Sequence, residues 1–324
     1  MDKDIYPGIA HAQAFTQETL TRLRERLEKT LKGTPYAEAI TLVATGSYGR
    51  GEATPESDLD WFIIFDRDQP AEVIANEISQ ITAVIKEVVP INAGDTGTFG
   101  EDAIVHFSDM QSNIGGKNDT NETLTRRLLF LLEGTWLYSE ERFNQYRRQL
   151  LEKYIKPTSP DRQIPRFLLN DIIRYYRTIA TDFEYKTSEG NKEWGLRNIK
   201  LRFSRKLIYF SGIVVAAELP NLSWHEKVAK ALALFNQPVL KRITSLGAEV
   251  EATTIILEAY ESFTQQIANP AIRQKLEEVE KEKRHECPEY MKLKDAADDF
   301  SKALHCWLVQ KYSEDDLIHH ALVF

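Results

Sequence analysis

The hydrophobic positions of the chain follow two patterns, and the change between them comes near residue 110. Before this point, short apolar runs at 40–44 and 59–65 predict buried strands. Segments 14–31 and 71–88 instead repeat apolar residues at helical spacing with charges between them, which predicts amphipathic helices. Strands and helices that alternate in this way predict a small mixed α/β sheet.

Helical spacing dominates the rest of the chain. After a loop at 113–119, Thr120 is a candidate cap for a helix that runs to about Leu132. The clearest break follows at 156–160, where two prolines stand among small polar residues. Beyond it, apolar residues recur at helical spacing over 164–186, 194–217, 224–235, 248–268, 270–285 and 292–313.

These patterns predict an α+β protein with two domains. Residues 1–155 would form a mixed-sheet domain with an N-terminal helix, and residues 156–324 would form an all-α helical bundle. A chain of 324 residues is long enough to bury cores of this size.

Composition and charge indicate the cellular environment of the protein and the classes of partner that it can bind. The chain has 49 acidic and 41 basic residues, and its net charge of −8 argues against a general nucleic-acid coat. No apolar run approaches the length of a membrane span, and the first residues lack the basic start and apolar middle of a signal peptide. Cys287 and Cys306 are the only cysteines and have no metal-site spacing. We therefore expect a cytoplasmic protein without a membrane partner.

Candidate chemistry is concentrated between the two predicted strands. Gly46 ends the first strand and would let the backbone approach a ligand closely. Ser47 offers a hydroxyl and a backbone N–H where a short helix would begin, and anions bind at such places. Asp58 and Asp60 would share one face of the second strand, because side chains alternate along a strand. Two such carboxylates suit Mg²⁺, which prefers oxygen ligands and a bridging substrate phosphate.

Each part of this motif also occurs without function. Serine and aspartate commonly cap helices or close turns, and a glycine-serine pair alone is uninformative. The ordered combination is more specific: a strand, the motif G-S-x-x-R-G-E, then S-D-x-D and an apolar strand. This order favours an active site that acts on a nucleoside triphosphate.

At these residues the chain resembles the DNA polymerase β-like nucleotidyltransferase superfamily. The resemblance implies that Gly46 and Ser47 hold the phosphates of a nucleoside triphosphate, and that Asp58 and Asp60 bind metal. It further implies two Mg²⁺ ions, with Mn²⁺ as a second candidate, and a third carboxylate on a later strand.

Asp95 is the first candidate for the third carboxylate. It lies in an extended stretch of small residues after the predicted helix, and its Gly-Asp-Thr-Gly-Thr-Phe string resembles the D-x-G-H-S stretch of protein-PII uridylyltransferases. Thr98 and Phe99 replace the His-Ser of that family. Alternatively, Asp95 is a turn residue beside two glycines. The next candidates are Glu101, Asp102 and Asp109.

Two further segments resemble the same branch. Residues 194–200 are similar to the G-G-L-R-D segment of protein-PII uridylyltransferases, and residues 125–133 resemble a helix of related nucleotidyltransferases. The first resemblance makes Arg197 and Lys200 the best candidates for neutralising triphosphate charge, within a basic region at 162–206. The alternative is an ordinary solvated helix face.

Arg50 has two interpretations. It could contact a phosphate, or it could pair with Glu52 or with one of the strand aspartates.

The expected function is transfer of a nucleoside monophosphate from a triphosphate to an acceptor, with release of pyrophosphate. The acceptor stays open between a protein hydroxyl, an RNA end such as that of tRNA, and a small molecule. The base and the oligomeric state are open as well. The alternative from another class is a nucleotide-binding regulatory or antitoxin-like protein that keeps the fold without turnover.

Overall fold

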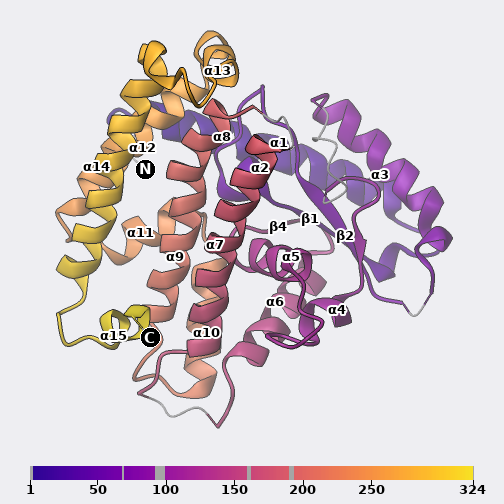
Figure 1. Cartoon of the computed structure of the whole chain (residues 1–324). Coiled ribbons are helices and arrows are strands. Elements are labelled where there is room, and N and C mark those ends of the chain that lie inside the picture. Colours follow the sequence, from indigo (N-terminus) through magenta and orange to yellow (C-terminus); the bar gives the residue numbers. More distant parts are fainter. Residues whose placement is uncertain (1–2, 68, 92–98, 159–161, 190–192, 324) are drawn as a thin grey trace. The chain divides into compact units, whose positions relative to one another are not determined.

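The computed structural model describes residues 3–67, 69–91, 99–158, 162–189 and 193–323 (Figure 1). Contacts divide the chain into two compact units. One unit is Gln13–Lys156 and is called the sheet unit here; the other combines Met1–Ala12 with Pro157–Phe324 and is called the helical unit. The division falls within α1 (Pro7–Leu31). The domain boundary expected after residue 155 stays a prediction.

The sheet unit is built on a mixed sheet with the strand order β3-β2-β1-β4. β1 (Ile40–Ala44) pairs antiparallel with β2 (Trp61–Phe65) and with β4 (Thr135–Tyr138). β2 pairs in parallel with β3 (Ile104–Val105). A mixed sheet followed by many helices confirms the predicted α+β class.

Both faces of this sheet are buried. Leu42, Trp61 and Ile63 point into a core that also contains leucines of α1 and isoleucines of α3 (Ala75–Val88). The residues that alternate with them, such as Val43 and Phe62, are also fully buried. A sheet covered on both faces has nearly continuous apolar strands, as the sequence of β1 shows.

Short helices connect and flank the strands. Thr120 caps α5 (Asn121–Leu132) as predicted, and its side chain accepts a hydrogen bond from the Thr123 amide. The helix predicted over 71–88 is divided into a 3₁₀ turn and α3. The remaining elements of the sheet unit are η1 (Ala37–Ala39), α2 (Gly46–Arg50), η2 (Ala71–Ile74), α4 (Phe107–Gln111), α5 (Asn121–Leu132) and α6 (Glu140–Tyr154).

The helical unit contains the predicted helices and two that the pattern did not indicate, α11 (Val239–Leu246) and α15 (Leu317–Val323). Its elements are α7 (Arg166–Ser188), α8 (Gly195–Lys200), the π-helical η3 (Leu201–Arg205), α9 (Lys206–Ala217), α10 (Trp224–Phe235), α11 (Val239–Leu246), α12 (Ala252–Ile267), α13 (Pro270–Glu277), η4 (Arg284–Glu286), α14 (Pro288–Lys311) and α15 (Leu317–Val323).

Aromatic side chains fill the centre of the helical unit. The Phe203 ring stacks on Phe263 with a centroid distance of 4.5 Å and lies 5.1 Å from Phe300, so η3, α12 and α14 share one core. The start of α1 belongs to this unit, because the Glu261 carboxylate accepts hydrogen bonds from the amides of Gly8 and Ile9.

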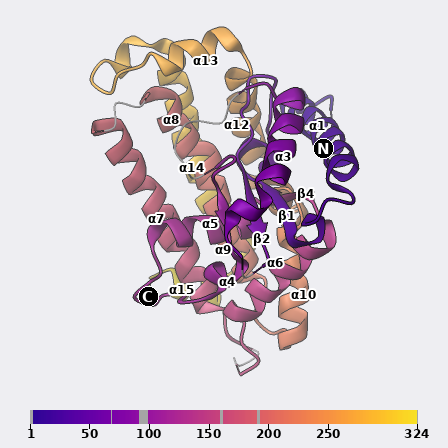
Figure 2. The ribbon, with the colours of Figure 1, turned by 90° about the vertical axis from the view of Figure 1, so that its right-hand side faces the viewer.

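One predicted helix is shorter than expected. The helix predicted over 270–285 ends at Glu277, and turns and η4 follow it. α13 and the segment after it form one end of the unit (Figure 2). None of the described helices combines the length and the apolar character that crossing a membrane requires.

Candidate active site

The bend after β1 lies directly against Asp60. The β1–β2 pairing ends at Ala44 and Trp61, and the next residue pair is joined by a hydrogen bond of 2.8 Å from the Thr45 amide to the Asp60 carbonyl oxygen. Gly46 then turns the chain with a φ of +66°. A Cβ built on Gly46 would stand 2.4 Å from Asp60 Oδ2, so only glycine leaves room for the carboxylate.

Asp58 and Asp60 lie in the segment that leads into β2. They were predicted to be on the strand itself, but its ladder begins at Trp61 because β1 turns away at Gly46. Both are half-buried, whereas Leu59 between them is buried in the core of the sheet unit. This alternation agrees with the prediction that the two carboxylates face away from the core.

Tyr48 of α2 lies close enough to Asp58 for the carboxylate charge to affect its pKa. Burial raises the pKa of the Tyr48 hydroxyl to about 12, and the negative charge of Asp58 adds to the shift. The phenol therefore keeps its proton at neutral pH. The ring belongs to the core of the sheet unit, so it anchors α2 to this core.

Arg50 and Glu133 form a buried ion pair behind the bend. Arg50 Nη1 donates to Glu133 Oε2 over 2.6 Å, and Arg50 Nε donates to Glu52 Oε2 over 2.7 Å. The other Glu133 oxygen, Oε1, accepts the Gly46 amide at 3.0 Å. Of the two interpretations of Arg50, the structure thus contains the pair with Glu52 and adds a second pair with Glu133.

A second glycine brings α2 against the same residue. A Cβ on Gly49 would stand 2.2 Å from the Glu133 carbonyl oxygen, so this position also excludes a side chain. Ser47 between the two glycines is half-buried in α2, and its carbonyl oxygen accepts the Glu52 amide at 2.8 Å. The motif G-S-x-x-R-G-E therefore folds into one tight turn fixed from both ends.

Sequence reasoning missed the role of Glu133. It is the last residue of the segment 125–133, whose resemblance to related nucleotidyltransferases was noted without assigning a role to any side chain. A signal was present: an acidic residue follows the apolar run at 128–132 and precedes Gly134. Such a residue in such a setting needs a buried partner, but the sequence does not tell which.

The structure describes three of the four candidates for a third carboxylate. Asp95 lies outside the described residues. Glu101 and Asp102 are exposed in the turn before β3, and this turn is tied to the start of β2 by a 2.8 Å hydrogen bond from the Gly100 amide to the Trp61 carbonyl oxygen. Asp109 is exposed on α4. Within the described ranges, no group of three or more His, Cys, Asp or Glu side chains is arranged to hold a metal ion.

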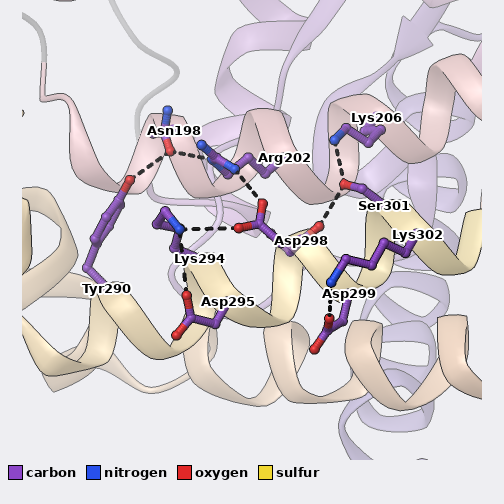
Figure 3. A network of polar contacts seen from close by, with 11 residues as sticks. Asn198, Arg202, Lys206, Tyr290, Lys294, Asp295, Asp298, Asp299, Ser301 and Lys302 are labelled. Atoms are coloured by element: carbon purple, nitrogen blue, oxygen red, sulfur yellow. Dashed lines mark hydrogen bonds and ion pairs between the residues drawn. The ribbon is translucent and has the colours of Figure 1, made fainter.

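The basic candidates lie in the helical unit. Arg197 is exposed and Lys200 half-buried on α8, and their contact with a triphosphate stays a prediction. Their neighbours on η3 and α9 are bound to α14 (Figure 3). Arg202 donates to Asp298 and Asn198 at 3.1 and 3.0 Å, and Lys206 donates to Ser301 at 2.6 Å. Burial, helped by the Arg202 charge, lowers the pKa of Lys206.

Comparison with known families finds a similarity within the sheet unit. Residues 20–96 match the model of the nucleotidyltransferase domain, and this range includes Gly46, Ser47, Asp58, Asp60 and Asp95. Over this range the chain is similar to the nucleotidyltransferase domain, and the predicted resemblance to the polymerase β-like superfamily is confirmed. A comparison with curated proteins finds no match. The closer resemblance to protein-PII uridylyltransferases stays a prediction.

Proposed function

We propose that the protein is a Mg²⁺-dependent nucleotidyltransferase that moves a nucleoside monophosphate from a triphosphate to an acceptor hydroxyl and releases pyrophosphate. One observation carries the proposal: the Gly46 bend touches the Asp60 carboxylate, with a built Cβ only 2.4 Å from Oδ2. Phosphates held at this bend would lie beside the acidic pair. The match of residues 20–96 to the nucleotidyltransferase domain supports transfer chemistry in general.

The donor set at this place suits a hard divalent cation. Asp58 and Asp60 are half-buried carboxylates that the alternation around Leu59 turns away from the core. Oxygen ligands of this kind are those that Mg²⁺ prefers. We propose that they hold two Mg²⁺ ions together with Asp95, and that Mn²⁺ is a second candidate. When bound, such ions would neutralise phosphate charge and stabilise the negative charge on the attacking and leaving oxygens.

The residues of the chain would divide the remaining work. Ser47 would contact the triphosphate through its hydroxyl, and Arg197 and Lys200 would balance the charge that develops on it. The acceptor oxygen attacks the α-phosphorus, and the bond from this phosphorus to the bridging oxygen of the β-phosphate breaks. The acceptor proton passes to a carboxylate, for which Asp95 is the candidate, and pyrophosphate leaves.

The acceptor we favour is a macromolecular hydroxyl, on a protein or at an RNA end, in the cytoplasm. Incubation of the protein with Mg²⁺, a cell lysate and each α-labelled triphosphate in turn tests this directly. Label recovered in the protein fraction identifies a protein acceptor, and label in the RNA fraction identifies an RNA end. Nucleotide binding without label transfer or pyrophosphate would contradict turnover and favour a regulatory or antitoxin-like protein.

A further inference from the structure

We propose that Glu133 is a positioning residue of this active site, and that it holds the Gly46 bend against Asp60 with Arg50 as its charge partner. The inference rests on the proposed function, because it concerns the place at which phosphate and metal would meet. Glu133 lies beyond the residues 20–96 that match the nucleotidyltransferase domain.

Both oxygens of the Glu133 carboxylate are used in the motif. Oε1 accepts the Gly46 amide at 3.0 Å, and Oε2 accepts Arg50 Nη1 at 2.6 Å. The side chain is completely buried, with an exposed fraction of 0%. One carboxylate therefore connects the first and the last residue of α2. A hydrogen bond in which one partner is charged is shorter and stronger than a neutral one, so this connection is firm.

Through Gly46, the contacts of Glu133 extend to the Asp60 carboxylate. Gly46, held by Glu133 on its amide side, contacts the Asp60 carboxylate on its Cα side. A displacement of the Gly46 amide would move the surface on which Asp60 rests. Since an error of about 1 Å in a reacting group can cost about 100-fold in rate, this contact matters for chemistry as well as for folding.

The arrangement also separates the roles of the two residues that begin the motif. The Gly46 amide already donates to a carboxylate. Gly46 therefore contributes its backbone conformation and its missing side chain, and the expected contact with phosphate falls to Ser47. A negative carboxylate beside a phosphate site would repel the ligand, and Arg50 offsets this charge from within hydrogen-bonding distance.

Charge removal at Glu133 tests the inference. Glu133→Gln keeps the size of the side chain but places either an amide NH₂ against Arg50 or an amide NH₂ against the Gly46 N–H. The matched control is Glu122→Gln on α5, the helix that ends just before Glu133; the Glu122 side chain is 66% exposed and pairs with Arg126. Four quantities are measured: the position and the hydrogen-exchange rate of the Gly46 amide signal in protein labelled with ¹⁵N-glycine, and kcat and KM in an assay of pyrophosphate release.

For Glu133→Gln we expect the Gly46 amide signal to move and its hydrogen exchange to speed up. We expect kcat to fall by about 100-fold while KM changes by less than about threefold, because the geometry is lost and the other nucleotide contacts remain. Glu122→Gln should leave all four quantities unchanged. An unchanged kcat in folded Glu133→Gln protein, or an unmoved Gly46 signal, would overturn the inference.

A second variant covers the case in which Glu133→Gln does not fold. Arg50→Lys keeps a cation but loses the fork that reaches both Glu133 and Glu52. It should lower kcat in the same way and to a smaller extent. A folded Arg50→Lys protein with the wild-type kcat would count against the proposed roles of both members of the pair.

A metal titration separates this inference from the proposed function. Mn²⁺ alone should broaden the Gly46 signal of the wild type, because the bend touches Asp60, and should broaden it less in Glu133→Gln. A wild type that releases no pyrophosphate but shows this difference would contradict the proposed function and leave the positioning role standing. Equal broadening in both proteins would contradict the positioning role.

Discussion

Gly46 and Asp60 meet where the β1–β2 ladder ends, and no side chain fits between them: a Cβ on Gly46 would stand 2.4 Å from Asp60 Oδ2. This contact places a bend with a positive φ directly beside one of the two acidic residues. The central claim about this protein, that phosphates and metal meet at the bend, depends on this relationship.

Substitution Gly46→Ala should therefore lower both the stability of the fold and the activity. The φ of +66° disfavours any residue with a Cβ, at a cost of about 1–2 kcal/mol, and the new methyl group displaces Asp60. The matched control is Gly33→Ala, because Gly33 has a φ of +84° but no atom within 4 Å of the built Cβ. Urea unfolding should show a loss in both variants, and pyrophosphate release should be lost in Gly46→Ala alone. An active Gly46→Ala protein would contradict the contact.

The buried pair of Arg50 and Glu133 should contribute strongly to stability. Their side chains are 8% and 0% exposed, so Arg50→Gln leaves the buried Glu133 carboxylate without the guanidinium that pairs with it. We expect a loss of about 3 kcal/mol or more in the free energy of unfolding. The pair of Glu122 and Arg126 is the comparison: the Glu122 side chain is 66% exposed, so Glu122→Gln should cost about 0.5 kcal/mol or less. Equal losses in the two variants would show that the Arg50 pair is not buried in solution.

Tyr48 should make the stability of the sheet unit depend on alkaline pH. Its pKa is raised to about 12 in the folded protein from 10.0, so the folded form keeps a proton that the unfolded chain releases in between. Stability from this group is complete below pH 10 and decreases as the pH rises toward 12, by about 2–3 kcal/mol in total. Tyr48→Phe should reduce this decrease in urea unfolding curves. Parallel curves for wild type and variant would show that the hydroxyl is not buried.

Metal binding should stabilise the wild type through the acidic pair. A ligand that binds only the folded state raises the unfolding temperature, so Mg²⁺ or Mn²⁺ should raise it in a concentration-dependent way. Asp58→Asn should abolish the increase. Glu56→Gln changes an exposed acid in the same loop and should keep it. An undiminished increase in Asp58→Asn would locate the metal elsewhere.

The basic residues of the helical unit should separate into two groups. Arg197 is exposed and is proposed to contact the triphosphate, so Arg197→Gln should raise KM for the nucleotide. Arg202 is already bound to Asp298 and Asn198, so Arg202→Gln should leave KM near the wild-type value. Steady-state kinetics with the preferred triphosphate measure both. A larger increase in KM for Arg202→Gln than for Arg197→Gln would reverse this assignment.

Local signals in the sequence were sufficient for part of the fold. β1 was predicted within its observed bounds, and the cap of α5 at Thr120 was confirmed, because an apolar strand and a capping side chain are encoded by neighbouring residues. β4 was missed. It has four residues and gains its stability from pairing with β1, which lies far away in the sequence.

In the candidate site, too, local relationships were predictable from the sequence and long-range ones were not. The closeness of the bend to Asp60 follows from a strand pair joined by a short connection, and this was anticipated from the motif alone. The role of Glu133 was not. It accepts the Gly46 amide across 87 positions of sequence, and only the tertiary fold brings the two together.

The most direct test of the central claim is the rate of pyrophosphate release by wild type and Asp60→Asn with Mg²⁺ and the triphosphate that the lysate experiment selects. Asp60→Asn keeps the shape of the side chain that rests on Gly46 and removes its charge. We predict pyrophosphate release by the wild type and a loss below detection in a variant whose circular dichroism spectrum is that of the wild type. A folded Asp60→Asn protein that releases pyrophosphate at the wild-type rate would contradict the claim.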